Sequence, residues 1–517
     1  MDISLLKNID PKLLLKYKVG LEREGLRVDQ TGKLSKLPHP IKLGSSLTNP
    51  FFTTDFAEQQ LEIVTSPRDS IEDLYDNFNS LHSYALKNMK NSEIIWNYSM
   101  PCHLTDEEIK IADFGSSNTG KFKRLYRKGL HNRYGKKMQM ISGIHFNFSF
   151  SDEMISEMYE ERDRGTKEQS GKDLNRQDFV SEIYMHICRN FLRLSSLLTY
   201  IFGKSPVYLQ DFLNYDHPDL KSKNDCCYKK SATSFRMSDI GYSNSKQCKF
   251  QISYNGIDDY TKDLYRALKT QCVKHEKIDK SKQLNDKILQ IEAEYYNLIR
   301  PKPKMLDGKK NADLLNENGV DYIEFRGIDI DLNEPLGISK DKLYFLHLFI
   351  IYCLEIESPN LSDKEKREIT QNQKKVALNG ISNKTKILKH GKNIPFHEYG
   401  ISVLKEIEYI ANILDSSTNH KLYLSSLRQQ IKKFENPTIS KNIQETVLNQ
   451  NSFNEYILKK SKAHAKSLRN KYITNELKKE LDELSKKSIE DQLKLEKNDK
   501  ISFEDFVLEN THHKTIK

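Results

Sequence analysis

The chain has 517 residues, of which 37% are hydrophobic and 30% are charged, and its 82 basic and 72 acidic side chains give a net charge of +10. A sizeable core beneath a heavily charged surface is therefore expected, in one large domain or several ordinary ones. The positive excess is small beside the total charge and the lysine-rich tracts are scattered, so a solvated surface is expected rather than a nucleic-acid-binding patch.

Neither a membrane span nor a secretory signal is predicted. The most apolar stretch, residues 343–354, is shorter than the roughly twenty residues that cross a bilayer and contains His347, so it is expected to be a buried helix. The first 18 residues have no uninterrupted apolar region. Seven cysteines are few for this length and odd in number, which favours reduced thiols in a cytoplasmic protein.

Alternating apolar and polar residues predict strands, and longer periodic segments predict helices. The expected strands are 21–28, 61–64, 142–150 and 319–330. The expected helices are 70–92, 179–203, 257–272, 342–357 and 362–379, and residues 155–177 and 216–230 are expected to be polar loops. Strands mixed with long helices, without regular βαβ alternation, predict an α+β fold.

The last part of the chain differs in composition from the rest. From about residue 439 onward glycine is absent and Lys, Glu, Leu and Ile dominate, which predicts exposed amphipathic helix, for example at 475–499. We expect a catalytic domain over residues 1–440 and a helical extension over residues 441–517.

Acidic side chains gather on the polar faces of the predicted strands. Glu22 and Glu24 are two residues apart, so both leave the same face of an extended chain. Asp55, Glu58 and Glu62 crowd a second short segment. Carboxylates that share one sheet face repel one another unless cations lie among them. Taken singly, each acid is better explained by a solvated surface, but the whole set is not.

Two further strands contribute polar groups of other kinds. His145 lies on the polar face of an otherwise aromatic strand, and Glu324 shares a strand face with Arg326. Carboxylate oxygens with one imidazole suit magnesium or manganese better than zinc. The strands together therefore predict a divalent cation site.

A series of sequence words resembles the monofunctional bacterial glutamate–cysteine ligases. The clearest are 20–27 (GLEREGLR), 142–149 (SGIHFNFS) and 322–326 (YIEFR). The others are 53–58, 61–62, 100–102, 117–123, 125–127, 233–242, 290–294 and 299–302. They occur in the family's order and cover roughly residues 15–440. Two features depart from the family: Gly25 stands where its motif has threonine, and the region 216–230 does not match clearly.

The resemblance implies a saddle-shaped antiparallel sheet of the glutamine-synthetase type, flanked by helices, with ATP and metal ions on its concave face. It implies that ATP phosphorylates the γ-carboxylate of L-glutamate and that the amine of L-cysteine then attacks the γ-glutamyl phosphate, which is the first step of glutathione biosynthesis. It further implies Mg²⁺, or alternatively Mn²⁺, and feedback inhibition by glutathione. We expect a monomer that binds neither nucleic acid nor membrane.

The resemblance also assigns roles to individual residues. The implied metal ligands are Glu22, Glu24, Asp55, Glu62, His145 and Glu324. The implied catalytic residues are Arg326, which would bind the transferring phosphoryl group, and Glu324. The implied substrate-binding residues are Phe56, Tyr126, Leu130, Tyr242 and Tyr296 around cysteine, with Arg127 and Arg236 for substrate carboxylates. Any one of these tyrosines taken alone is better explained as a core residue, since the chain has 26 of them.

Four alternatives remain open at this point. Residues 115–121 have the G-x-x-x-x-G-K frame of a P-loop, but Phe122 replaces the hydroxyl residue that should hold magnesium. The basic run 121–137, with its interleaved aromatics, would suit nucleic acid, although the acidic strands would repel phosphates. Cys226, Cys227, Cys248, Cys272 and His275 would have to form a zinc module without a common spacing. Lastly, a related ligase would join glutamate to another small amine.

Overall fold

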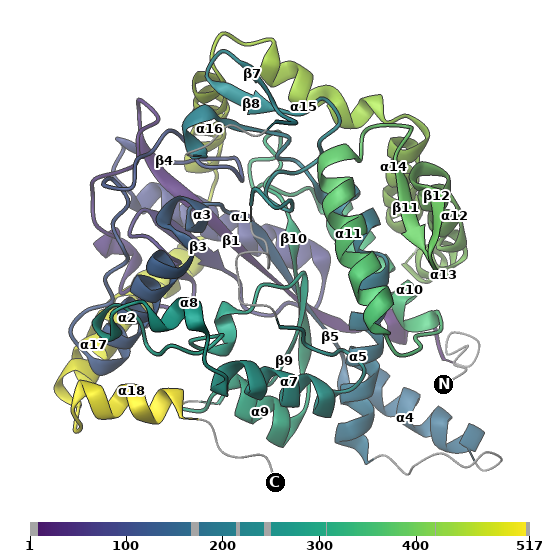
Figure 1. The fold of residues 1–517 in the computed structure, drawn as a ribbon, viewed down its shortest axis with the longest axis horizontal. Coiled ribbons are helices and arrows are strands. Elements are labelled where there is room, and N and C mark those ends of the chain that lie inside the picture. The colour runs from purple at the N-terminus through teal and green to yellow at the C-terminus, as the bar shows by residue number, and fades with distance from the viewer. Residues whose placement is uncertain are drawn as a thin grey trace.

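The computed structural model describes residues 9–166, 175–213, 218–241, 250–306, 308–418 and 420–512, and an open antiparallel sheet forms its centre (Figure 1). The strands lie in the order β2 (Phe52–Thr54), β3 (Gln60–Val64), β1 (Tyr17–Asp29), β5 (Ile144–Phe150), β10 (Tyr322–Ile328) and β9 (Ile299–Lys302). A short strand, β4 (Glu93–Ile95), pairs with the end of β1. All four predicted strands are present, so the predicted α+β class is confirmed.

The sheet register places the acidic residues of separate strands opposite one another. Glu22 on β1 is paired with His145 on β5, and Glu24 with Glu62 on β3. On the other side of β5, Glu324 of β10 is paired with Asn147. Because strand side chains alternate between the two faces, this register gathers the polar groups on one face of the sheet.

The opposite face carries the apolar side chains and is covered by helices. Ile323 and Phe325 of β10 are buried, and the Phe325 ring contacts Phe191 of α5 (Arg176–Arg193) and Phe202 of α6 (Ser195–Phe202). Behind them lies α10 (Lys340–Glu355), whose side chains from Lys342 to Leu354 are all buried. The sheet thus separates a helical core from a polar face.

The predicted helices are all present, with bounds that differ by a few residues. They are α1 (Ile71–Asn88), α5 with α6, α7 (Ile257–Lys269), α10 and α11 (Asp363–Asn379). The single helix expected over 179–203 is interrupted at Leu194 and is therefore two helices. Within the described part of the chain, no helix is long and apolar enough to cross a membrane.

Two predicted loops are wrong. Residues 152–166 form α4 (Asp152–Thr166), because Met154, Ile155 and Met158 recur at helical spacing and are buried, which the polar composition concealed. Residues 167–174 lie outside the described residues. In the region 216–230, β7 (Lys221–Lys223) and β8 (Cys226–Tyr228) form a small sheet with β6 (Val207–Leu209).

Further α-helices and strands lie before residue 396. They are α2 (Asn118–Tyr134), α3 (Lys136–Gln139), α8 (Val273–Glu276), α9 (Asn311–Asn318), β11 (Lys386–Lys389) and β12 (Lys392–Pro395). Cys272, just before α8, is disulfide-bonded, so the expectation that all thiols are reduced is wrong for this residue. Cys102, Cys188, Cys226, Cys227 and Cys353 are free. Cys248 lies outside the described residues.

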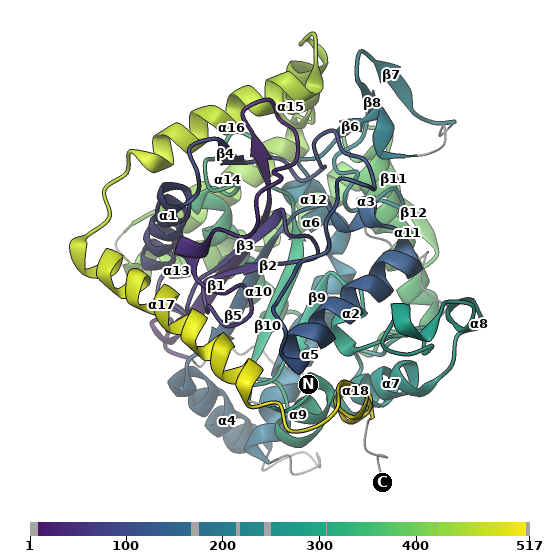
Figure 2. The ribbon, with the colours of Figure 1, turned by 90° about the vertical axis from the view of Figure 1, so that its left-hand side faces the viewer.

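The remainder of the chain is helical. It comprises α12 (Phe396–Glu406), α13 (Glu408–Thr418), α14 (Leu422–Glu435), α15 (Thr438–Leu448), α16 (Phe453–Arg469), α17 (Asn475–Lys497) and α18 (Phe503–Thr511). The prediction of helix over 475–499 is confirmed. In Figure 2, α17 and α18, in yellow, run along one side of the molecule and end beside α2.

Candidate active site

The polar face of the sheet forms the floor of a pocket of about 440 Å³. Every predicted site residue that the structure describes lines this pocket. These residues are Glu22, Glu24, Asp55, Phe56, Glu62, Tyr126, Arg127, Leu130, His145, Arg236, Tyr296, Glu324 and Arg326. Tyr242, also predicted, lies outside the described residues. Side chains that are up to about 300 positions apart in the sequence thus meet at one place.

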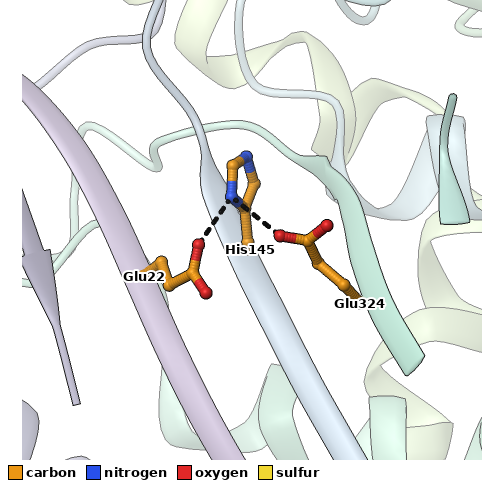
Figure 3. Close-up of side chains that lie close together, drawn as sticks. All are labelled: Glu22, His145 and Glu324. Atoms are coloured by element: carbon orange, nitrogen blue, oxygen red, sulfur yellow. Dashed lines mark hydrogen bonds and ion pairs between the residues drawn. The ribbon is translucent and has the colours of Figure 1, made fainter. Parts of the chain in front are cut away.

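Glu22, His145 and Glu324 form the centre of the pocket floor, on three adjacent strands (Figure 3). The Nδ1 atom of His145 lies 3.1 Å from Oε2 of Glu22 and 3.7 Å from Oε1 of Glu324. One ligand atom from each residue lies within 4.8 Å of the other two, which is close enough for all three to bind one ion. It is the only such group among the residues that the structure describes.

Burial and neighbouring charges keep these three side chains in the protonation states that can bind a cation. Burial, together with the charge of Arg326, lowers the pKa of His145, so its imidazole is neutral and can act as a ligand. Burial alone would raise the pKa of Glu22, but its hydrogen bond with His145 lowers it instead. Burial likewise opposes ionisation of Glu324, yet Lys302 and Arg326 hold its pKa well below the usual value.

A second group of carboxylates, formed by Glu24, Asp55 and Glu62, lines the same pocket. Nε2 of His145 lies 3.8 Å from Oε1 of Glu24, which is paired with Glu62 across β1 and β3. Burial and the nearby charge of Asp55 raise the pKa of Glu24 to about 8. The pKa of Glu62 is raised well above its usual value by burial and by the charges of Asp55, Glu22 and Glu24.

The geometry of the first group and the charge of the second group both favour a divalent cation. In the second group, burial and the repulsion between neighbouring carboxylates raise the pKa values of Glu24 and Glu62, and a bound cation would relieve the repulsion. In the first group, the buried Oε2 atom of Glu324 has no hydrogen-bond partner. Carboxylate oxygens and one imidazole are donors that suit Mg²⁺ or Mn²⁺.

Cationic side chains line the same sheet face next to the carboxylates. Nη1 of Arg326 donates a hydrogen bond to Oε1 of Glu324 at 3.0 Å, and Nζ of Lys302 lies 3.8 Å from its Oε2. Arg326 also lines the pocket, and a guanidinium can donate two parallel hydrogen bonds to an anion. This arrangement places positive charge beside the carboxylates, where phosphate oxygens could lie.

An apolar and aromatic wall closes one side of the pocket. Phe56, Tyr126, Leu130 and Tyr296 contribute to it, and the Tyr296 hydroxyl donates to Oε1 of Gln139 at 3.2 Å. Tyr126 and Leu130 are one helical turn apart on α2, so they present the same face of that helix. A small side chain could be enclosed here.

Two arginines predicted to bind substrate carboxylates also donate hydrogen bonds to backbone carbonyls. Nε of Arg127, on α2, donates to the backbone carbonyl of Asp55, and its guanidinium lies over the Phe114 ring at 4.5 Å. Nη2 of Arg236 donates to the backbone carbonyl of Arg326 at 2.8 Å. A Cβ added at Gly143 would lie only 2.1 Å from the same Nη2 atom. The absence of a side chain at position 143 therefore leaves room for the Arg236 guanidinium.

The sequence-based assignment left Glu58 out of the ligands and missed several residues that line the pocket. Glu58 does not line the pocket, because its carboxylate accepts hydrogen bonds from the backbone N–H groups of His39 and Asp113. Arg300 and Lys302 line it, and their period-two spacing on β9 could have revealed them. The missed residues with no such signal are Gln139, Leu192, Met237, Ser238, Ala293, Asn297, Leu298, Gly327, Ile369, Thr370, Gln373 and Lys374.

Gly25, the departure from the family motif, has a structural reason. Its position on β1 faces the side chain of Ile95, and a Cβ there would lie 2.6 Å from Cγ2 of Ile95. The space that a larger side chain at position 25 would need is therefore filled by Ile95. The strand is continuous through Gly25.

Comparison with known proteins identifies the family. A family model described as glutamate–cysteine ligase matches residues 3–376. The glutamate–cysteine ligase of Alcanivorax borkumensis is 37% identical over 460 residues, 86% of each chain, and that of Saccharophagus degradans is 36% identical over 503 residues, 95% of this chain and 93% of the other.

Solved structures give the same result. A crystal structure of the glutamate–cysteine ligase of Francisella tularensis in complex with AMP superposes with a TM-score of 0.88 at 33% identity, covering 96% of this chain and 97% of that one. The saddle-shaped sheet implied by the resemblance is thereby confirmed. A bifunctional glutathione synthetase of Pasteurella multocida has the same fold, with a TM-score of 0.71 at 22% identity, and this chain covers 54% of it. The chain therefore belongs to the glutamate–cysteine ligase family, whose members are ATP-dependent ligases.

Proposed function

We propose how this pocket carries out the ATP-dependent ligation of L-glutamate to L-cysteine. ATP transfers its γ-phosphoryl group to the γ-carboxylate of glutamate, releasing ADP. The cysteine amine then attacks the carbonyl carbon of the γ-glutamyl phosphate, phosphate leaves, and the amine proton passes to solvent. The supporting observation is that two carboxylate groups, Arg326 and an aromatic wall share one pocket of about 440 Å³.

The first proposed element is the cation site. Glu22, His145 and Glu324 would hold one divalent ion, and Glu24, Asp55 and Glu62 would hold a second. We propose Mg²⁺, with Mn²⁺ as the alternative, because the donors are mostly carboxylate oxygens. Such ions, when bound, would neutralise the charge of the nucleotide phosphates.

The second element is the cationic edge formed by Arg326, Lys302 and Arg300. Phosphoryl transfer depends mainly on positioning and on neutralising the charge of the transferring group. Arg326 has a planar guanidinium that can donate two parallel hydrogen bonds to phosphoryl oxygens. Glu324 fixes its orientation through the 3.0 Å hydrogen bond, which is why we assign both residues to catalysis.

The third element is the cysteine pocket. We propose that Phe56, Tyr126, Leu130 and Tyr296 enclose the cysteine side chain, and Tyr242 joins this set by its place in the matching motif 233–242. The guanidinium groups of Arg127 and Arg236 line the same pocket and would attract substrate carboxylates. The wall is apolar with polar edges, which suits a small thiol-bearing amino acid better than a cationic amine.

The single most informative test is phosphate release from ATP in the presence of glutamate and a panel of amines. We expect release with cysteine, weaker release with 2-aminobutyrate, which lacks the thiol, and none with putrescine or glycine. Release with Mg²⁺, its loss on chelation and its return on adding Mg²⁺ or Mn²⁺ would check the cation site. Preferential use of putrescine would contradict the cysteine assignment.

We further propose that residues 1–440 form the catalytic domain, that the chain is a cytoplasmic monomer and that glutathione inhibits it. Glutathione contains both a γ-glutamyl and a cysteinyl unit, so it matches the two substrates that the pocket would bind. Inhibition competitive with glutamate, measured by phosphate release, is the expected result. Analytical ultracentrifugation would test the monomer.

A further inference from the structure

Helix α2, which carries Tyr126, Arg127 and Leu130 into the pocket, has no acidic residue in its own first turn. Helix N-termini carry unpaired N–H groups and a partial positive charge, so an acidic side chain nearby stabilises them. Here Ser117 caps the helix by accepting from the N–H of Gly120 at 3.1 Å, and Lys121 adds positive charge. Negative charge at this N-terminus is supplied by a distant segment.

It comes from the end of the chain. The N–H of Asn118 donates to Oδ2 of Asp499 at 2.7 Å, and the N–H of Ser116 donates to Oε1 of Glu496 at 2.9 Å. The side-chain amide of Asn118 also donates to the carbonyl of Ile501 at 2.9 Å. Two carboxylates about 380 residues away in the sequence therefore occupy the helix N-terminus.

The close approach of the two segments requires glycine at two positions. Gly115 has φ +84° and Gly44 has φ +81°, values that favour glycine. A Cβ at Gly115 would lie 2.2 Å from Oε1 of Glu496, and one at Gly44 would lie 2.3 Å from Oγ of Ser488. The P-loop frame at 115–121 thus has a different explanation: its backbone N–H groups bind carboxylates of the same chain, not a nucleotide phosphate.

The same C-terminal segment also holds the loop that leads to Asp55. The N–H of Ser45 donates to Oγ of Ser488 at 3.0 Å, and Thr48 donates to the carbonyl of Ser488. The loop continues into β2 and Asp55, whose backbone carbonyl accepts from Arg127 of α2. On α18, Phe506 packs edge-on against Phe122 of α2, with ring centroids 6.0 Å apart. Figure 2 shows α17 and α18 following this path.

We propose that Glu496 and Asp499 are positioning residues for cysteine binding: they fix the N-terminus of α2 and so set the place of Tyr126 and Arg127 in the pocket. Neither carboxylate touches substrate. This inference rests on the proposed function, because it assumes that the wall formed by α2 receives cysteine.

The test is the double variant Glu496→Gln/Asp499→Asn, which removes both charges and keeps the side-chain shapes. The matched control is Glu480→Gln/Glu490→Gln, which removes two charges from exposed positions of α17, the helix that carries Glu496. Cysteine-dependent phosphate release is measured in the full chain. We expect KM for cysteine to rise about fivefold in the first variant, with kcat and KM for ATP and glutamate changed less than twofold. The control keeps all constants.

A rescue separates positioning from general loss of structure. Thr119→Asp places an acidic residue in the first turn of α2 itself and, added to the double variant, should restore most of the KM for cysteine. An unchanged KM for cysteine in the double variant, or equal losses in all constants without rescue, overturns the proposal. Absence of cysteine-dependent phosphate release from the unaltered chain overturns this proposal and the proposed function together, whereas release that is insensitive to the double variant overturns this one alone.

Discussion

Glu22 and His145 are directly paired across strands β1 and β5, and Oε2 of Glu22 lies 3.1 Å from Nδ1 of His145. Glu324 reaches the same nitrogen from the other side of β5, at 3.7 Å. The imidazole is therefore held between two carboxylates on adjacent strands. This relationship forms the centre of the proposed cation site.

Glu324→Gln should abolish ligation with little loss of stability. The amide keeps the volume of the side chain but removes a ligand charge, so a bound cation would be misplaced. Phosphate release should fall at least about a hundredfold, in the range seen when one catalytic electrostatic contact is removed, while the thermal midpoint stays close to that of the unaltered chain. Glu317→Gln, at an exposed position on α9, is the control. Near-normal turnover of Glu324→Gln would remove Glu324 from the site.

Arg326→Lys should lower kcat strongly while KM for cysteine changes little. Lysine keeps the charge but cannot donate two parallel hydrogen bonds to a phosphoryl group. A decrease in kcat of about a hundredfold is expected, as for loss of one contact to a transferring group. Steady-state kinetics with all three substrates would check it. If lysine supports full activity, a simple point charge suffices and our assignment of bidentate binding is wrong.

Glu294→Gln should destabilise the protein by about 3 kcal/mol, because it leaves a buried arginine without its counter-charge. The carboxylate of Glu294 accepts from Nη1 of Arg133 at 2.9 Å, from the Tyr134 hydroxyl at 2.6 Å and from the N–H of Gln290 at 2.6 Å. The Arg133 and Glu294 side chains are fully buried. Urea unfolding gives the measurement. Glu483→Gln, in an exposed pair with Lys479, should be nearly neutral.

His347 should make the protein less stable in mild acid. Burial lowers its pKa to about 3, and its Nδ1 lies 2.8 Å from the Tyr423 hydroxyl. Between pH 6.5 and 3 the unfolded chain binds a proton at this residue and the folded chain does not, so the free energy of unfolding falls as the pH is lowered. At pH 5 this amounts to about 2 kcal/mol.

The variant His347→Gln removes this titration and can still bond to Tyr423. The difference between its urea midpoints at pH 7.5 and pH 5.0 should therefore be smaller than in the unaltered chain. His512→Gln, at an exposed position, is the control and should leave the difference unchanged. An equal pH dependence in His347→Gln and the unaltered chain would show that His347 is protonated in the folded state.

The sequence alone determined which side chains share a strand face. The spacing of Glu22 with Glu24, and of Glu324 with Arg326, requires that each pair points the same way, because strand side chains alternate. The matching words then identified the family, and the predicted strands followed from alternation. The sequence was misleading at α4, where a polar composition concealed the buried Met154, Ile155 and Met158.

Only the tertiary structure decided which strands are neighbours. Nothing local in the sequence indicates that β1 lies between β3 and β5, yet this order brings Glu22 to His145 and Glu24 to Glu62. The contact of Asp499 with α2 is equally invisible in sequence, because it joins segments about 380 residues apart through single hydrogen bonds. Local spacing sets the direction of a side chain, whereas the packing of distant segments sets what it meets.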